Sequence, residues 1–310
     1  MSLNLAMDRT SDKQAQYAQG DQQLLAEIDA AIDGGLKAVA ILDPASFASA
    51  WPQFGALASA RGGGSLFAGT PQAQDPAVAP LLVPLQRADV GTHAALTRIA
   101  RQSPAVVWLA SDVEAKALAE MLAAKLHAEL SDGGRPITLR YYDPRVLPEL
   151  LRVLDLEQQR SLNDGVRIWW WLDRDNAVQR SDADTARPVN DEARPFGAAI
   201  ALRDEQLHDL LDASFIDRVL DIVVRTSTDC LKSFDRAERF ELSTRLIEAA
   251  SRWCLTSEFD CANYIVVALQ QGEAFAGHPA WADLMLQVKA GALRFTDAIE
   301  NWEQRHADLA

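Results

Sequence analysis

The stretch LRYYDPRVL at 139–147 holds the densest set of side chains that could do chemistry: two arginines, two tyrosines and an aspartate. On a strand, Arg140 and Tyr142 share one face, and Arg145 follows at the start of a helix. A guanidinium beside a helix N-terminus favours anions, so the cluster could bind a small anionic substrate or a carboxylate of a partner protein. An internal ion pair with one of the chain's own acids is the commoner arrangement.

The aspartates of two Asp-Pro steps that follow strand patterns have a simpler explanation than catalysis. AVAILDP at 38–44 and LRYYDP at 139–144 both run a strand pattern into Asp-Pro and then into a helical pattern. Aspartate is a preferred N-cap, and proline is favoured at the first helical position. We therefore predict that Asp43 and Asp143 cap helices, and that SDVE at 111–114 forms a capping box.

Other sequence patterns offer no catalytic residue, no cofactor site and no metal site. RGGGS at 61–65 lacks the lysine of a phosphate loop, and no GxSxG elbow occurs. The five histidines are scattered, without a CxxC or HxxxH pattern. The chain is therefore not expected to be an enzyme, although an enzyme acting on a small anionic substrate at the RYYDPR strand end stays an alternative. A buried and fully paired Arg145 would count against that alternative.

Three consecutive tryptophans, 169–171, lie in a strand pattern. Trp169 and Trp171 then point one way and Trp170 the other. Burial of both sides in a core is the simpler interpretation. Since tryptophan and arginine dominate the energetics of protein interfaces, Trp170 is also a candidate anchor for a protein partner.

Composition and charge limit the partners. The chain has 310 residues, 48% of them apolar and 24% charged, with a net charge of −14 and a pI near 4.8. This acidity disfavours nucleic acid and anionic membrane surfaces. There is no secretory signal and no apolar segment of membrane-spanning length, and three cysteines fit a reducing compartment. A cytoplasmic location is therefore expected.

Strand and helix patterns alternate at 36–175, which predicts an α/β lobe with a mixed sheet. Its strands are predicted at 37–43, 80–85 (an edge strand, because of its prolines), 105–111, 137–143 and 166–172, and its helices at 97–102, 113–130 and 144–154. Before this lobe, 1–35 is an N-terminal segment, with a poorly ordered start and a first helix at 22–32.

After this lobe, 176–202 is polar and is predicted to be a linker or surface loop. The remainder, 203–310, is predicted to be an all-helical lobe of about five amphipathic helices. These helices are expected at 214–227, 238–253, 258–272, 279–291 and 293–305.

Five motifs, taken in order, resemble a known family. They are AILD (40–43), SLFAGT (65–70), PLLVPL (80–85), WLAS (108–111) and RYYDPR (140–145). Together they are similar to the signature of the effector adaptors, or chaperones, of bacterial type VI secretion. The resemblance covers about 36–175, and the helical lobe fits the family's usual C-terminal extension.

This resemblance implies a protein that binds a toxic effector in the cytoplasm and helps to load it onto the VgrG spike or its PAAR tip. It implies no catalysis. Arg140, Tyr142, Asp143, Arg145 and Trp170 are then candidates either for partner binding or for the signature of the fold. An interaction module of unrelated function, using the helical lobe alone, is a further alternative.

Overall fold

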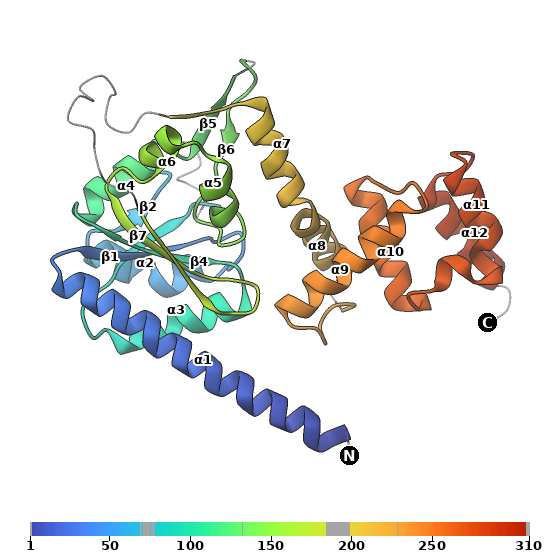
Figure 1. Cartoon of the computed structure of the whole chain (residues 1–310), viewed down its shortest axis with the longest axis horizontal. Coiled ribbons are helices and arrows are strands. Elements are labelled where there is room, and N and C mark those ends of the chain that lie inside the picture. Colours follow the sequence, from blue (N-terminus) through green and yellow to red (C-terminus); the bar gives the residue numbers. More distant parts are fainter. Residues whose placement is uncertain are drawn as a thin grey trace. The chain divides into compact units, whose positions relative to one another are not determined.

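The computed structural model describes residues 2–68, 70, 75, 78–131, 133–183, 199–227 and 229–307. The chain divides into two compact units, Met1–Leu210 and Leu211–Ala310. The first unit combines sheets and helices, and the second is helical (Figure 1). The expected fold class, an α/β part followed by a helical part, is confirmed.

A six-stranded sheet forms the centre of the first unit, counting the described residues. Its strands, in spatial order, are β2 (Gly64–Ser65), β3 (Leu81–Pro84), β1 (Lys37–Leu42), β4 (Val106–Ser111), β7 (Val166–Leu172) and β8 (Val178–Asp182). All neighbouring strands are antiparallel, where a mixed sheet was expected. The helix α3 joins β3 to β4, which run in the same direction, but these two strands are not neighbours. β1 lies between them and is antiparallel to both. β3 is consequently an inner strand, and not the predicted edge strand.

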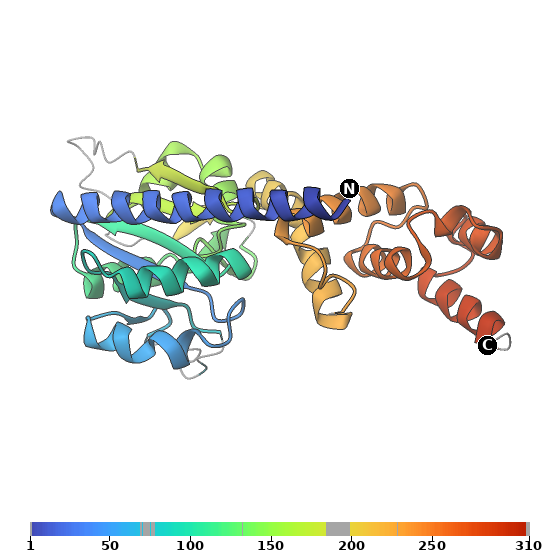
Figure 2. The same cartoon turned by 90° about the horizontal axis from the view of Figure 1, so that it is seen from below.

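Both faces of this sheet are buried, which explains the unbroken apolar runs in β1, β3 and β4. One face packs against α1 (Ser2–Asp33), α2 (Ala50–Ala60) and α3 (Val90–Gln102). The other face packs against α4 (Ala115–Ala123), α5 (Leu147–Val153) and α6 (Leu156–Leu162). Figure 1 shows these two helical layers on opposite sides of the sheet, and Figure 2 shows α1 alongside α3.

The three tryptophans of β7 divide between the two cores. Trp169 and Trp171 belong to the core on the α4 side, whereas Trp170 belongs to the core on the α1 side. Trp170 lies opposite Trp108 in the β4–β7 ladder and is completely buried. The predicted alternation and the predicted burial are both confirmed.

A second, three-stranded sheet of the described residues has the order β6 (Ile137–Thr138), β5 (His127–Leu130) and β9 (Ile200–Leu202). This sheet is mixed, with β5 antiparallel to β6 and parallel to β9. The helix predicted at 113–130 is wrong at its end, since β5 pairs with a distant strand that local helix propensity does not reveal. The strand predicted at 137–143 is also too long, since only its first two residues pair.

Two predictions about polar segments need correction. Within 176–202, predicted as a linker, the structure has β8 and β9, and 184–198 lies outside the described residues. β8 is strand because its whole length pairs with Ile168–Leu172 of β7, although its sequence VQRSD lacks apolar alternation. The N-terminal segment is helical from Ser2 onward, because it contains good helix formers and no proline. Its helix ends before Gly34-Gly35, as predicted.

The second unit contains the five predicted helices. They are α8 (Phe215–Thr226), α9 (Arg236–Ser251), α10 (Glu258–Gln271), α11 (Pro279–Lys289) and α12 (Phe295–Ala307), with a short 3₁₀ turn, η2 (Phe275–Gly277), before α11. Helix α7 (Asp204–Ala213) crosses the division between the units along the chain. Aromatic residues concentrate in the core of the second unit, where Trp281 and Trp302 stack with centroids 5.2 Å apart. None of the core residues of this unit belongs to the two cores of the first.

Gly63 is required by the close approach of β3. A Cβ atom at this position would lie 2.3 Å from the carbonyl oxygen of Leu82 and 2.5 Å from Cδ of Pro84. We expect Gly63→Ala to lower the free energy of unfolding of the first unit by about 1–3 kcal/mol, because neither backbone nor proline ring can move cheaply. Urea denaturation measures this loss.

Gly91 provides the matched control for that substitution. It lies in α3, and a Cβ there meets no atom within 4 Å. Gly91→Ala is expected to leave stability unchanged or to raise it by up to about 1 kcal/mol. Equal effects of the two substitutions would contradict the packing described for Gly63.

Candidate functional site

The Asp-Pro steps at 43–44 and 143–144 build matching turns instead of the predicted helix caps. After β1, Asp43 Oδ1 accepts a hydrogen bond from the Ala45 N–H at 3.0 Å, and its Oδ2 accepts one from the Ser46 hydroxyl at 2.9 Å. The turn does not continue into a helix, since α2 begins only at Ala50. Asp43 therefore stabilises an isolated turn, in which the N–H of Phe47 bonds to its carbonyl oxygen.

Asp143 has the same local role. Its Oδ1 accepts from the Arg145 N–H at 2.9 Å, and its carbonyl oxygen accepts from the N–H groups of Val146 and Leu147. Helix α5 begins at Leu147 and has Val146, not Asp143, as its N-cap. The predicted capping box at 111–114 is likewise wrong, because Ser111 ends β4 and bonds to the Gly165 carbonyl oxygen.

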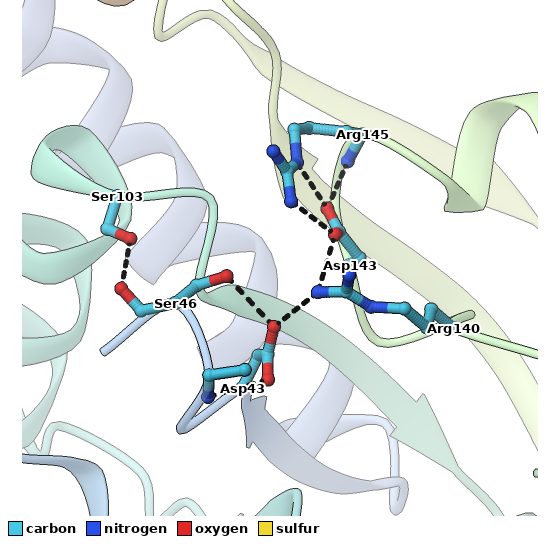
Figure 3. A network of polar contacts seen from close by, with 7 residues as sticks. Asp43, Ser46, Ser103, Arg140, Asp143 and Arg145 are labelled. Atoms are coloured by element: carbon cyan, nitrogen blue, oxygen red, sulfur yellow. Dashed lines mark hydrogen bonds and ion pairs between the residues drawn. The ribbon is translucent and has the colours of Figure 1, made fainter. Parts of the chain in front are cut away.

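Ion pairs join these two turns into one network (Figure 3). Arg140 Nη2 lies 2.7 Å from Asp43 Oδ2 and 3.0 Å from Asp143 Oδ2, so one guanidinium bridges two carboxylates. Arg145 pairs with Asp143 through two atoms, Nε to Oδ1 at 3.1 Å and Nη2 to Oδ2 at 2.9 Å. The network thus connects residues 97 positions apart in the sequence.

The network is buried at its acidic centre. The side chains of Asp143 and Asp43 are 0% and 2% exposed, that of Arg145 is 11% exposed and that of Arg140 is 35% exposed. Two carboxylates removed from water need partners of opposite charge, and the two arginines supply them. Burial alone would lower the pKa of Arg140, but Asp143 and Asp43 outweigh it, so the pKa is raised and the guanidinium stays charged.

Two serines extend the network toward α3. Ser46, bonded to Asp43, accepts through its carbonyl oxygen a hydrogen bond of 2.5 Å from the Ser103 hydroxyl (Figure 3). Ser103 is the C-cap of α3, and β4 begins three residues later at Val106. The turn after β1 is thereby tied both to the RYYDPR segment and to the end of α3.

The tyrosines of the signature point into the core on the α4 side. Tyr141 is fully buried, with its hydroxyl donating to the Leu122 carbonyl oxygen at 2.8 Å, and Tyr142 is 4% exposed. The two rings meet edge to face. Burial, followed by the charge of Asp43, raises the pKa of Tyr142 to about 12.

This pKa makes stability depend on pH in the alkaline range. An unfolded Tyr142 loses its proton near pH 10, whereas the folded residue keeps it to about pH 12. The unfolded state therefore binds fewer protons between these values, and stability falls as pH rises through them. We expect the free energy of unfolding to drop about 2–3 kcal/mol more in the wild type than in Tyr142→Phe. Parallel pH profiles of the two proteins, from urea denaturation, would contradict this.

The structure separates the five candidate residues into two places. Arg140, Tyr142, Asp143 and Arg145 come together, as their spacing predicted. Trp170 lies on the opposite face of the sheet, where its indole N–H donates to Glu27 at 2.8 Å. With no exposed surface, Trp170 cannot act as an anchor for a partner in the folded chain. Of the five, Arg140 has the largest exposed fraction.

Sequence reasoning missed the partner of Arg140. Asp43 was considered only as a cap, and Ser46 and Ser103 were not considered. The available signal was the repeated Asp-Pro step, because two buried strand ends that both finish in aspartate need cations nearby. Arg140 and Arg145 are the arginines nearest to Asp143 in the sequence, whereas the arginine nearest to Asp43 is Arg61.

In the part of the chain that the structure describes, no three His, Cys, Asp or Glu side chains are grouped so that they could hold a metal ion. No described helix is both long enough and apolar enough to cross a membrane. An open depression of about 350 Å³, lined by Lys37, Arg61 and Glu114 among others, lies at the start of β1, the opposite end from Asp43.

Comparison with known proteins places the network inside a recognised domain. No curated protein matches the chain significantly, and no solved structure does. One family model matches, and its range contains Asp43, Ser103, Arg140 and Arg145 but ends before Trp170. Residues 39–161 match the domain family described as a domain of unknown function, DUF4123.

Proposed function

We propose that this chain is a non-enzymatic adaptor that binds a type VI secretion effector in the cytoplasm and helps to load it onto the VgrG or PAAR spike. The observation that carries the proposal is the match of 39–161 to DUF4123, a family associated with such adaptors. The same range contains all five motifs that resemble the adaptor signature, in the same order.

The ion-pair network supports this proposal by explaining what the signature does. AILD ends in Asp43, and RYYDPR contributes Arg140, Asp143 and Arg145, so the two motifs are halves of one buried contact. The WLAS and PLLVPL motifs form β4 and β3 of the central sheet. The motifs thus specify a scaffold, and the surface that recognises a partner lies outside their buried side chains.

The pairing of Arg145 counts against the enzyme alternative. A substrate anion would need an available guanidinium, whereas Arg145 is almost fully buried and held at two atoms by Asp143. Arg140 is engaged by two carboxylates. An anion that drew both arginines away from these carboxylates would leave Asp43 and Asp143 buried without their cations, at a cost of several kcal/mol.

Co-expression provides the test. The tagged chain is expressed with a type VI effector and a VgrG protein of the same organism, and we expect at least one of them to co-purify with it. Gly91→Ala is the folded control and should behave like the wild type. Absence of any complex at about 10 μM, with the chain shown to be folded, would overturn the proposal.

Deletion of 211–310 separates the adaptor from an interaction module that uses the helical unit alone. Neither core of the first unit includes a residue of the deleted segment, so the shortened chain is expected to fold. An adaptor that uses its DUF4123 unit retains part of its partner binding. Complete loss of binding by a folded Met1–Leu210 fragment would favour the module.

A further inference from the structure

His93 is buried in α3 without a hydrogen bond to its ring. The residue is 3% exposed, and among the described residues neither Nδ1 nor Nε2 has a partner. Buried polar groups are normally paired, and an imidazole with both nitrogens unpaired carries a desolvation cost. That cost is small enough to accept only while the ring is neutral, since an unpaired buried cation costs far more.

His93 lies between two polar contacts that connect the region of α3 to α1. At one end of α3, Arg101 bonds to Asp21 at 2.5 Å and to the Tyr17 carbonyl oxygen at 2.7 Å. Before the other end, the Ala88 N–H donates to Asp29 Oδ1 at 3.0 Å. The two helices therefore run antiparallel and lie side by side (Figure 2), and the apolar stripe of α1 packs in the same core as the inner residues of α3.

That apolar stripe forms one core with the inner residues of α3. Leu24, Ile28 and Ala31 of α1 belong to the same buried cluster as Leu96 and Ala100 of α3. His93 is three residues before Leu96 and seven before Ala100, and so shares their side of the helix. A charge on the ring would consequently appear inside the packing between α1 and α3.

Among the described residues, no carboxylate is hydrogen-bonded to the ring of His93. Two carboxylates are near enough to attract it, Asp29 and Asp89. Asp29 is bonded to the Ala88 N–H, and Asp89 accepts from Arg61 at 2.7 Å and from the Thr92 N–H at 3.2 Å. Arg87 and Asp33, a further charged pair of this region, form an exposed ion pair in which Nε lies 2.7 Å from Oδ1.

We propose that His93 makes the docking of α1 sensitive to acid, and that protonation of its ring shifts the equilibrium toward release of α1 from α3. Release would uncover the core on this face of the sheet, including the side of β4 and β7 that carries Trp108 and Trp170. In this proposal, the docked state of α1 is favoured by a neutral His93, and the released state by a protonated one.

The direction of the effect follows from the change in the pKa of His93. Burial lowers this pKa in the docked state, and the attraction of Asp29 and Asp89 restores only part of it. A released ring returns toward its ordinary pKa of about 6.5. The released state therefore binds more protons below that pH. At pH 5.5 it is favoured by up to about tenfold more than at pH 7.5.

Hydrogen exchange of the full chain, corrected for the intrinsic effect of pH, tests the proposal. Amides of Leu24 to Ile32 in α1 are expected to exchange up to about tenfold faster at pH 5.5 than at pH 7.5. Amides of α10, in the other unit, serve as the internal reference. His93→Leu fills the site with a group that cannot titrate, and should remove the acceleration.

Two further variants keep the outcome decisive. His93→Met replaces the ring by a flexible apolar side chain if leucine disturbs folding, and His127→Gln alters an exposed histidine of β5 as the matched control. The control is expected to retain the acceleration in α1. Equal protection of α1 at both pH values in the wild type would overturn the proposal, as would an acceleration that persists in a folded His93→Leu or His93→Met protein.

Discussion

Asp143→Ala is expected to lower the free energy of unfolding of the first unit by about 3–5 kcal/mol. The substitution removes the carboxylate that holds Arg145 at two atoms and Arg140 at one. Arg145 is 11% exposed and would be left as a nearly buried cation without its carboxylate. Urea denaturation followed by circular dichroism measures the loss, with the transition of the first unit analysed separately from that of the second.

Asp155 offers a matched control, because it caps a helix and makes its ion pair only at the exposed surface. It begins α6 with a complete capping box, and its contact with Arg203 is exposed. Asp155→Ala should cost about 1 kcal/mol. A loss of the same size for Asp143→Ala would mean that Asp143 also acts only on its own turn, and that the network contributes little to stability.

Trp170→Ala is expected to cost about 3–5 kcal/mol, because it empties a completely buried site between β4, β8 and α1. It also removes the hydrogen bond to Glu27. Phe259→Ala, which shortens an aromatic side chain that is 70% exposed, should change stability by less than about 0.5 kcal/mol. Thermal or urea unfolding of both variants measures the contrast.

Variants of Trp170 also distinguish a core residue from an anchor for a protein partner. Trp170→Phe preserves most of the buried volume and is expected to fold and to retain partner binding. A Trp170→Ala protein with wild-type stability and no partner binding would contradict the core assignment and restore the interface interpretation.

Local sequence patterns were sufficient to predict the strands that are buried on both faces and the helices that bury one face. The β-branched and aromatic runs VVWLAS and VRIWWWL predicted β4 and β7 within a residue. Amphipathic spacing predicted the helices of the second unit, because a helix buries one stripe whatever its partner is. In these elements the signal is contained in neighbouring residues.

Predictions failed where the decisive contact is distant in the sequence. KLHAEL has helix-forming residues, but His127–Leu130 becomes β5 because Ile200–Leu202 pairs with it. VQRSD becomes β8 because β7 provides a partner along its length. The RYYDPR segment turns at Arg140 to reach Asp43, so its strand stops at Thr138. Single-residue propensities carry no information on such partners.

The candidate site was predictable in its members but not in its role. The types and spacing of Arg140, Asp143 and Arg145 indicated a charged cluster, and an internal ion pair was the favoured arrangement. Only the fold shows that Asp43 completes it and that Arg145 is turned inward. Whether a charged group faces water or protein depends on the packing of the whole unit.

The most direct test of the proposed function is a titration of the purified chain with a purified type VI effector and a purified VgrG protein of the same organism. Calorimetry is expected to give saturable binding to at least one of them, with a dissociation constant below about 10 μM. The Asp155→Ala protein, which remains folded, should bind equally well. A chain that unfolds cooperatively, and is therefore intact, yet gives no heat with either protein up to about 100 μM would contradict the adaptor function.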